Sequence, residues 1–108
     1  MEITKSFDQN TLTVGLIGSL DTHAAEGFSA EIGSDIEKAD KLILDFKELT
    51  YISSAGLRSV LSLHKTMAKK GGMIVKNASA EIMFILDSTC FTDFLTFEDC
   101  EPIPDSAF

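Results

Sequence analysis

The chain has 108 residues, of which 44% are hydrophobic and 24% are charged, and this composition is typical of one globular domain with a single core. Its 9 basic and 17 acidic residues give a net charge of −8, which disfavours direct binding to the phosphate backbone of a nucleic acid. No apolar run approaches the ~20 residues that span a bilayer, and no basic segment followed by an apolar one opens the chain. We therefore expect a cytoplasmic protein that binds neither nucleic acid nor membrane and whose partner is another protein.

The N-terminal part of the chain predicts a β-hairpin followed by a helix. Two runs alternate with polar neighbours, Ile3, Lys5 and Phe7 in the first and Leu12, Val14 and Leu16 in the second, and Asp8-Gln9-Asn10 between them has turn chemistry. Asp21-Thr22 then suits the N-terminal cap of a helix. The buried side of this helix is predicted to carry four apolar residues, with Ala39 at its end: Ala25, Phe28, Ile32 and Ile36.

A strand over Lys41–Phe46 and a second helix over Leu57–Lys70 are predicted next. Leu42-Ile43-Leu44 is apolar at consecutive positions, so we expect this strand to be covered on both faces. Gly71-Gly72 suits the end of the second helix because glycine tolerates a left-handed backbone. The apolar side of that helix is predicted to comprise Leu57, Val60, Leu61, His64 and Ala68.

The C-terminal part predicts a short strand, a third helix and a last strand. Met73-Ile74-Val75 forms the short strand, and the helix starts near Ser79 and is lined by Ile82, Ile85 and Leu86. Phe94–Phe97 alternates again as the last strand. Strands that alternate with helices after a hairpin predict an α/β fold, a mixed β-sheet with helices packed on it. Right-handed crossovers would place neighbouring helices on one side of that sheet.

Two adjacent serines lie where the central strand meets the second helix, in Tyr51-Ile52-Ser53-Ser54-Ala55-Gly56-Leu57-Arg58. The first turn of a helix has unsatisfied N–H groups and the positive end of the helix dipole. A serine hydroxyl can cap it, and a phosphate placed there is also well accepted. Ser54 thus has two interpretations: an N-cap whose replacement by alanine costs about 1 kcal/mol, or a phosphorylation site.

These residues resemble the signature of the STAS domain, and by pattern most of all that of the bacterial anti-sigma factor antagonists. The match runs through Leu42-Ile43-Leu44-Asp45-Phe46, Leu49 and the segment from Tyr51 to Leu57, with Gly18-Ser19-Leu20-Asp21 upstream and Ile85-Leu86-Asp87-Ser88 and Phe94 downstream. In that family the serine before the small residue and the glycine is phosphorylated, and here it is Ser54. Ser53 stands where many relatives carry aspartate, which leaves open that Ser53 is an alternative acceptor or that phosphorylation is slower.

The resemblance implies a partner switch. The unphosphorylated domain would bind an anti-sigma factor with a serine kinase fold and thereby free a sigma factor, in a stress response or in sporulation. The kinase would phosphorylate Ser54 with ATP, and a serine phosphatase would restore the binding form. The alternative is a ligand-sensing or signalling-scaffold STAS module without a phosphoswitch. The length predicts a single domain, which we place over residues 1–98, and we expect a monomer when free. STAS domains usually close with a further helix, but the tail over 99–108 is short and interrupted by prolines, so we expect this helix to be incomplete.

The expected partner-binding residues gather where two helices start. Functional crevices of open α/β sheets form beyond the carboxyl ends of strands, and Asp21 and Ser54 each follow such a strand. Asp21 is either a helix-end charge or part of the partner surface. Arg58 places a positive charge near the positive end of the helix dipole, which is unfavourable. It therefore has two interpretations: a contact with a partner or with a phosphate, or a solvated surface arginine. The full predicted set is Asp21, Thr22, Ser53, Ser54, Ala55, Gly56, Leu57 and Arg58.

No pattern of catalytic, cofactor-binding or metal-binding residues accompanies this motif. His23 and His64 are isolated in the sequence, and no Ser/His/Asp order is found. Cys90 and Cys100 lack the paired spacing of a zinc site or a redox motif. We therefore expect a protein that is not an enzyme and that holds no cofactor or metal.

Overall fold

A computed structural model of the protein describes residues 1–88 and 96–98. Within them the elements run in chain order as β1 (Glu2–Asp8), β2 (Thr11–Leu20), α1 (Thr22–Lys38), β3 (Lys41–Ile52), α2 (Ser54–Ala68), β4 (Met73–Lys76), α3 (Ala80–Ser88) and β5 (Thr96–Glu98). Phe94 of the predicted last strand and the predicted tail, 99–108, lie outside the described residues.

The five strands form one mixed sheet in the order β1-β2-β3-β4-β5. β1 and β2 are antiparallel, whereas β2, β3, β4 and β5 run parallel to one another. Gln9 and Asn10 connect the first two strands with φ values of 49° and 69°, and two positive φ angles in succession are typical of the tight turn of a hairpin. The predicted α/β fold with an opening hairpin is confirmed.

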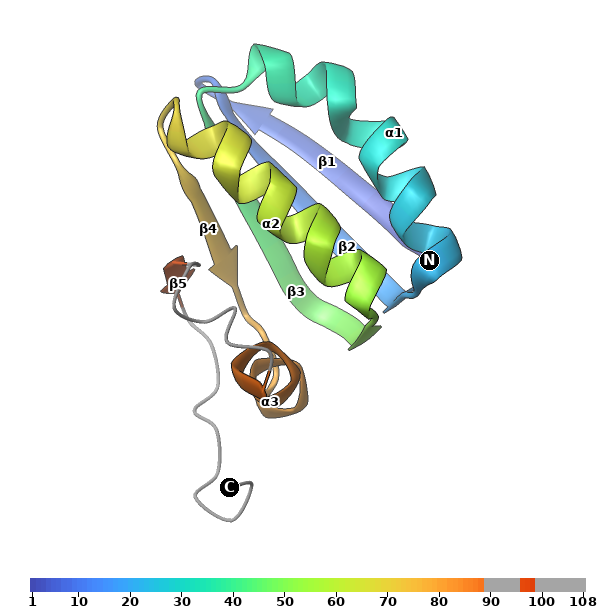
Figure 1. Ribbon diagram of the computed structural model, residues 1–108. Helices are drawn as coiled ribbons and strands as arrows, with labels where there is room; N and C mark the ends of the chain where they lie inside the picture. The colour runs from blue at the N-terminus through green and yellow to red at the C-terminus, as the bar shows by residue number, and fades with distance from the viewer. Residues whose placement is uncertain (89–95, 99–108) are drawn as a thin grey trace.

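The core lies between the sheet and the two long helices, α1 and α2, which cover the same face (Figure 1). Leu12, Leu42 and Met73 are in register on three neighbouring strands and are buried beneath the helices. The predicted stripe of α1 is confirmed, because all four residues and Ala39 are buried. The expectation of a strand covered on both faces by helices is corrected at Ile43. Its side chain points to the opposite face of the sheet, which neither long helix covers, and it is half-buried.

β3 is longer than the sequence predicted because two bulges interrupt its alternation. Pairing shifts from Gly15 with Asp45 to Ile17 with Glu48, and it shifts again between Gly18 and Ser19. Each shift adds one residue to β3, which hides the period-two pattern after Phe46. The strand therefore continues to Ile52, which pairs with Leu20 at the end of β2.

α2 starts earlier and ends earlier than predicted, at Ser54 and Ala68. Ala68 is exposed and Met67 is fully buried in its place. The predicted glycine ending is confirmed: Gly72 has a φ of 96°, and its N–H donates to the carbonyl of Met67 at 2.9 Å. Lys70 then reaches the other long helix, because its Nζ donates to three carbonyls at the C-terminal end of α1, those of Ile36, Glu37 and Ala39.

Lys5 ties the edge strand β1 to α1. Its Nζ donates to Oδ2 of Asp35 at 3.0 Å and lies 3.7 Å from Oε1 of Glu31. The hydrogen bond to Asp35 is the main cause that raises the pKa of Lys5 above its ordinary value. In the described part of the chain, no helix is both long and apolar enough to cross a lipid bilayer.

Candidate functional site

The starts of α1 and α2 are brought together by one carbonyl at the end of β2. The carbonyl oxygen of Leu20 accepts the backbone N–H of Ser53 at 2.9 Å and the Ser53 hydroxyl at 3.1 Å. Asp21, the next residue along the chain, caps α1, and its Oδ1 accepts the N–H of Ala24 at 2.8 Å. Because β2 and β3 are parallel, both helices begin at the same edge of the sheet, as the sequence predicted.

The N-cap of α2 is Ser53, which corrects the interpretation of Ser54 as the cap. The Ser53 hydroxyl accepts the N–H of Gly56 at 3.1 Å, and its carbonyl accepts the N–H of Leu57 at 2.9 Å. Its side chain is also buried, with 9% of its surface exposed. The reason is register: Ser53 follows Ile52, which pairs with Leu20, so only Ser53 can reach the Leu20 carbonyl.

Ser54 is the first residue of α2 and its side chain is exposed. Its hydroxyl makes no hydrogen bond to another described residue, so no cap depends on it. It lies beside the free N–H groups of the first helical turn, where a negative charge is favoured by about 0.3–1 kcal/mol. Ser53 and Ser54 therefore differ sharply in role despite being the same residue type.

This difference gives a first testable prediction. Replacing Ser53 by alanine removes the cap and is expected to lower the free energy of unfolding by about 1–2 kcal/mol. Ser54→Ala is the matched control and is expected to change it by less than about 0.5 kcal/mol, as is usual for an exposed position. Urea unfolding of the two variants measures this, and equal losses of stability would contradict the assignment of the cap.

Gly56 allows α2 to approach the end of β2 closely. A Cβ at this position would lie 2.8 Å from the Leu20 carbonyl oxygen and 2.9 Å from Leu20 Cγ, and 3.0 Å from Cγ1 of Ile52. Real Cβ atoms essentially never approach other atoms more closely than 3.0 Å. Glycine is thus required here by the space available, and it holds the start of α2 against Leu20.

The predicted partner-binding residues divide into two groups. Asp21, Thr22, Ser54 and Arg58 are exposed, and Ala55 is half-buried. The other three, Ser53, Gly56 and Leu57, are buried. Leu57 belongs to the core, with 4% of its surface exposed, so it does not present an apolar contact to a partner. The buried group shapes the surface that the exposed group forms.

A groove of about 420 Å³ runs between α1 and α2 beside Ser54. The residues that line it are Thr22, Ala25, Glu26, Ser29, Ala55, Arg58 and Ser59. Across the groove Ser29 Oγ donates to Ser59 Oγ at 3.3 Å. Sequence reasoning missed Glu26, Ser29 and Ser59, because only the packing of the two helices places them next to the motif. The signal that could have found them is their helical spacing from Thr22 and Ala55.

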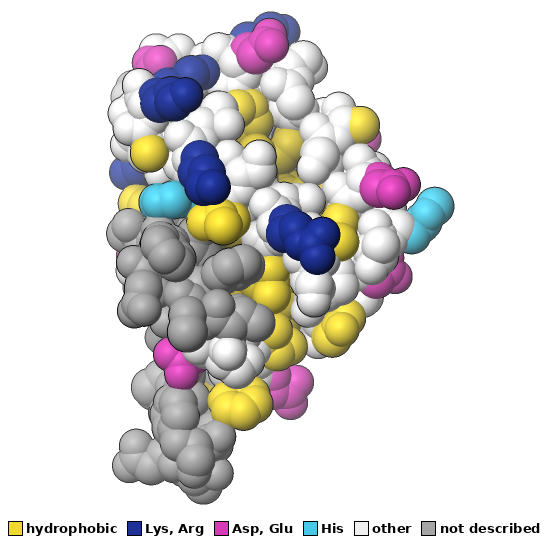
Figure 2. All heavy atoms as spheres, viewed as in Figure 1, with side chains coloured by type: hydrophobic (Ala, Val, Ile, Leu, Met, Phe, Trp, Pro, Cys, Tyr) yellow, Lys and Arg dark blue, Asp and Glu magenta, His cyan; other side chains and the backbone are white. Residues whose placement is uncertain are grey.

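The two walls of this groove differ in charge. α2 has no acidic residue, whereas α1 carries Glu26, Glu31, Asp35 and Glu37. Figure 2 shows the helix-covered face, with basic side chains over α2 and acidic ones around it. The surface beside Ser54 is therefore electrostatically mixed, with Arg58 on one wall and Glu26 on the other.

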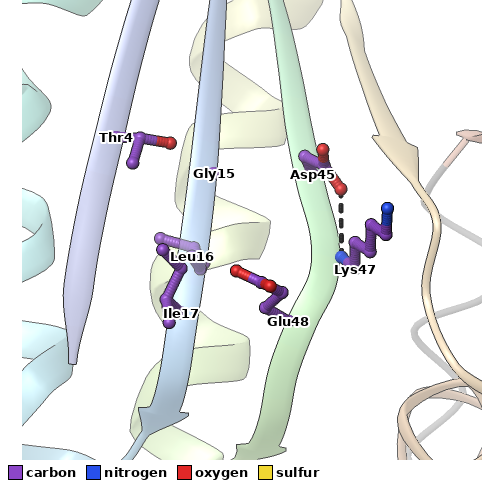
Figure 3. A pocket seen from close by; sticks show the side chains of 7 residues that line it. All are labelled: Thr4, Gly15, Leu16, Ile17, Asp45, Lys47 and Glu48. Carbon is purple, nitrogen blue, oxygen red and sulfur yellow. Dashed lines mark hydrogen bonds between the residues drawn. The ribbon is translucent and has the colours of Figure 1, made fainter.

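A second hollow, of about 190 Å³, lies on the opposite face of the sheet (Figure 3). It forms at the first bulge, where Gly15 has no side chain and Glu48 points toward the gap. Asp45 is engaged there in local structure, because its Oδ1 accepts the N–H of Lys47 at 3.0 Å and Nδ2 of Asn77 at 3.1 Å. We attribute this hollow to the bulge.

Neither histidine lines the groove between α1 and α2. His23 is exposed, and His64 is half-buried with its Nδ1 unbonded to any described residue. Cys90 and Cys100 lie outside the described residues. Within residues 1–88 and 96–98, no three side chains of histidine, cysteine, aspartate or glutamate are placed to hold a metal ion.

The model of the STAS domain family matches residues 2–102 of this chain. The chain belongs to the STAS domain family. This STAS domain is 34% identical over 76 residues to the candidate anti-sigma factor antagonist BtrV of Bordetella bronchiseptica. The match covers 69% of this chain and 66% of BtrV, which is just under two thirds of that protein. It is 25% identical over 104 residues to the anti-sigma F factor antagonist of Paenibacillus polymyxa, covering 94% of this chain and 89% of that protein.

Solved structures share the fold of this STAS domain. The anti-sigma factor antagonist SpoIIAA in its unphosphorylated form matches with a TM-score of 0.73 at 23% identity, covering 93% of this chain and 90% of SpoIIAA. The phosphorylated form of SpoIIAA from Bacillus matches with a TM-score of 0.70 at 22% identity, covering 90% of this chain and 91% of SpoIIAA. The resemblance inferred from the motif and the fold that it implied are both confirmed.

Proposed function

We propose that this STAS domain is an anti-sigma factor antagonist that is switched by phosphorylation. Unphosphorylated, it binds an anti-sigma factor with serine kinase activity and frees the sigma factor, and phosphorylation of Ser54 by that kinase ends the binding. A serine phosphatase restores the binding form. The observation that carries this proposal is the exposed hydroxyl of Ser54 at the first position of a helix that another serine caps.

Ser54 is favoured over Ser53 as the phosphate acceptor for a geometric reason. A kinase needs access to the hydroxyl oxygen, and the Ser53 hydroxyl is buried and engaged in two hydrogen bonds. Phosphorylating Ser53 would break the cap of α2 and the link to Leu20. Phosphorylating Ser54 breaks no described hydrogen bond, so the fold can accept both states.

Charge alone is sufficient to operate this switch. A phosphoserine adds roughly −1.5 to −2 charges, and placing that charge in a docked interface can cost several kcal/mol through desolvation or like-charge contact. Only ~2.7 kcal/mol is needed for a hundredfold loss of affinity. Because Ser54 is exposed and engaged in no described hydrogen bond, the proposed switch requires no large change of fold.

The names of the two relatives support the wider role, because one is an anti-sigma F factor antagonist and BtrV is a candidate anti-sigma factor antagonist. The proposed contact surface comprises the exposed edge at the two helix starts and the adjoining groove: Asp21, Thr22, Ser54, Ala55 and Arg58, together with Glu26. Ser53, Gly56 and Leu57 hold this surface in shape. We place the protein in the cytoplasm as a free monomer without a cofactor.

The proposal is tested by mixing the unphosphorylated chain with anti-sigma factor kinases from the same genome, each loaded with its sigma factor. We expect one kinase to form a complex with the chain and to release its sigma factor, as seen by size-exclusion chromatography. A chain that releases no sigma factor, and that instead co-purifies with a small molecule detected by native mass spectrometry, would support the ligand-sensing alternative.

Association with the partner is expected to slow as ionic strength rises. The chain carries a net charge of −8, and its proposed contact surface includes Asp21 and Glu26, so a partner would present basic groups. Charges at the rim of an interface act mainly on the association rate and are screened over ~8–10 Å. Stopped-flow rates at low and high salt measure this effect. An association rate independent of salt would exclude electrostatic steering and leave the switch at Ser54 in place.

A further inference from the structure

Arg58 lies four positions after Ser54, one helical turn along the same side of α2. Side chains four positions apart on a helix are neighbours, and each Cα–Cβ bond tilts toward the N-terminus of the helix. The long side chain of Arg58 is thereby directed back toward the first turn, where Ser54 is exposed. The reach between the two residues therefore follows from regular helix geometry.

Arg58 has no partner that would hold it away from Ser54. Its side chain is exposed, and among the described residues it forms no salt bridge or hydrogen bond. Glu26 lines the same groove from α1 but does not pair with it. A cation this close to the positive end of a helix is not explained by local stability. Glu26 lines the same groove as Arg58, and Asp21 caps α1 at the same edge of the sheet, so a nearby cation would offset the repulsion between these carboxylates and a phosphate on Ser54.

We propose that Arg58 is the counter-ion of the phosphate on Ser54. The inference rests on the proposed function, because it concerns the modified form of that site. A guanidinium can donate two parallel N–H groups to phosphate oxygens, which is the strongest common form of this contact. While it is paired, Arg58 offsets the repulsion between the phosphate and the carboxylates of Asp21 and Glu26, and it is withdrawn from the surface that a partner would contact.

The test uses the full chain with phosphoserine genetically encoded at position 54, so that no kinase is required. The second ionisation of a phosphoserine lies near pH ~6 and is followed by the ³¹P resonance. Because a cation favours the dianion, we expect the midpoint of this titration to lie lower by about 0.5 pH unit with Arg58 than in an Arg58→Gln variant. Lys65→Gln removes the same charge from an exposed position near the other end of α2 and is expected to leave the midpoint unchanged.

Equal midpoints with and without Arg58, or an equal change caused by Lys65→Gln, would overturn the proposal. Arg58→Lys keeps the charge without the two-pronged contact, so a midpoint between those of wild type and Arg58→Gln is expected. These results do not depend on whether any kinase modifies Ser54. Failure of the counter-ion and failure of the phosphorylation switch are therefore distinguishable.

Discussion

A Ser54→Asp variant is expected to fold like the wild type and to bind the anti-sigma factor kinase about 100-fold more weakly. The fold tolerates the change because Ser54 is exposed at the start of α2, where a carboxylate is favoured by the helix dipole. Binding suffers because the carboxylate must be desolvated in the interface, and ~2.7 kcal/mol of such cost gives the hundredfold loss. Calorimetric titration against the kinase measures the affinity.

Two control variants separate charge from size and from position. Ser54→Asn has nearly the same shape as Ser54→Asp without its charge, so it is expected to retain most of the affinity. Ser62→Asp places the same charge at an exposed position further along α2 and is expected to have little effect. If Ser54→Asn weakens binding as much as Ser54→Asp does, charge is not what the interface excludes.

Replacing Gly56 by valine is expected to lower the free energy of unfolding by about 3 kcal/mol, the upper part of the usual range for overpacking. The side chain would meet the backbone carbonyl of Leu20 and the side chain of Ile52, and this carbonyl is held in place by the two hydrogen bonds that it accepts from Ser53. For a domain of this size the loss corresponds to a fall in Tm of more than about 10 °C. Thermal unfolding measured by circular dichroism tests it.

Gly27 provides the matched control for Gly56. It lies within α1, and a Cβ at this position would meet nothing within 4 Å. Gly27→Ala is therefore expected to raise stability by about 0.5–1 kcal/mol through helix propensity alone. Gly56→Ala is expected to lower stability despite the same gain in propensity. Similar effects of alanine at both positions would show that the close approach at Leu20 is not what requires glycine.

The sequence was sufficient to predict the elements that have a clear period. The four buried residues of α1 follow helical spacing, and the hairpin turn at Gln9-Asn10 has residues that tolerate positive φ. The parallel pairing of β2 with β3 followed from the helix that connects the two strands. It was this pairing that placed Asp21 and Ser54 at the same edge of the sheet.

Other features depend on contacts between segments that are distant in the sequence. Adjacent serines are chemically identical, and only the position of the Leu20 carbonyl decides that Ser53 is the cap and that Ser54 is exposed. From the sequence, Leu57 could belong to the apolar side of the helix or contact a partner. Because Leu57 is buried in the core, it belongs to the apolar side of the helix. The groove between α1 and α2 could not be predicted, because no sequence pattern fixes how two helices pack against each other.

Peptide mapping by mass spectrometry, after the chain is incubated with ATP and the kinase that it binds, tests the phosphorylation switch most directly. The bound and free fractions are separated before mapping. We expect one phosphate, on Ser54, in chains recovered from the free fraction, and unmodified chains in the complex. Phosphate on Ser53, or chains phosphorylated on Ser54 that remain in the complex, would contradict the proposed switch.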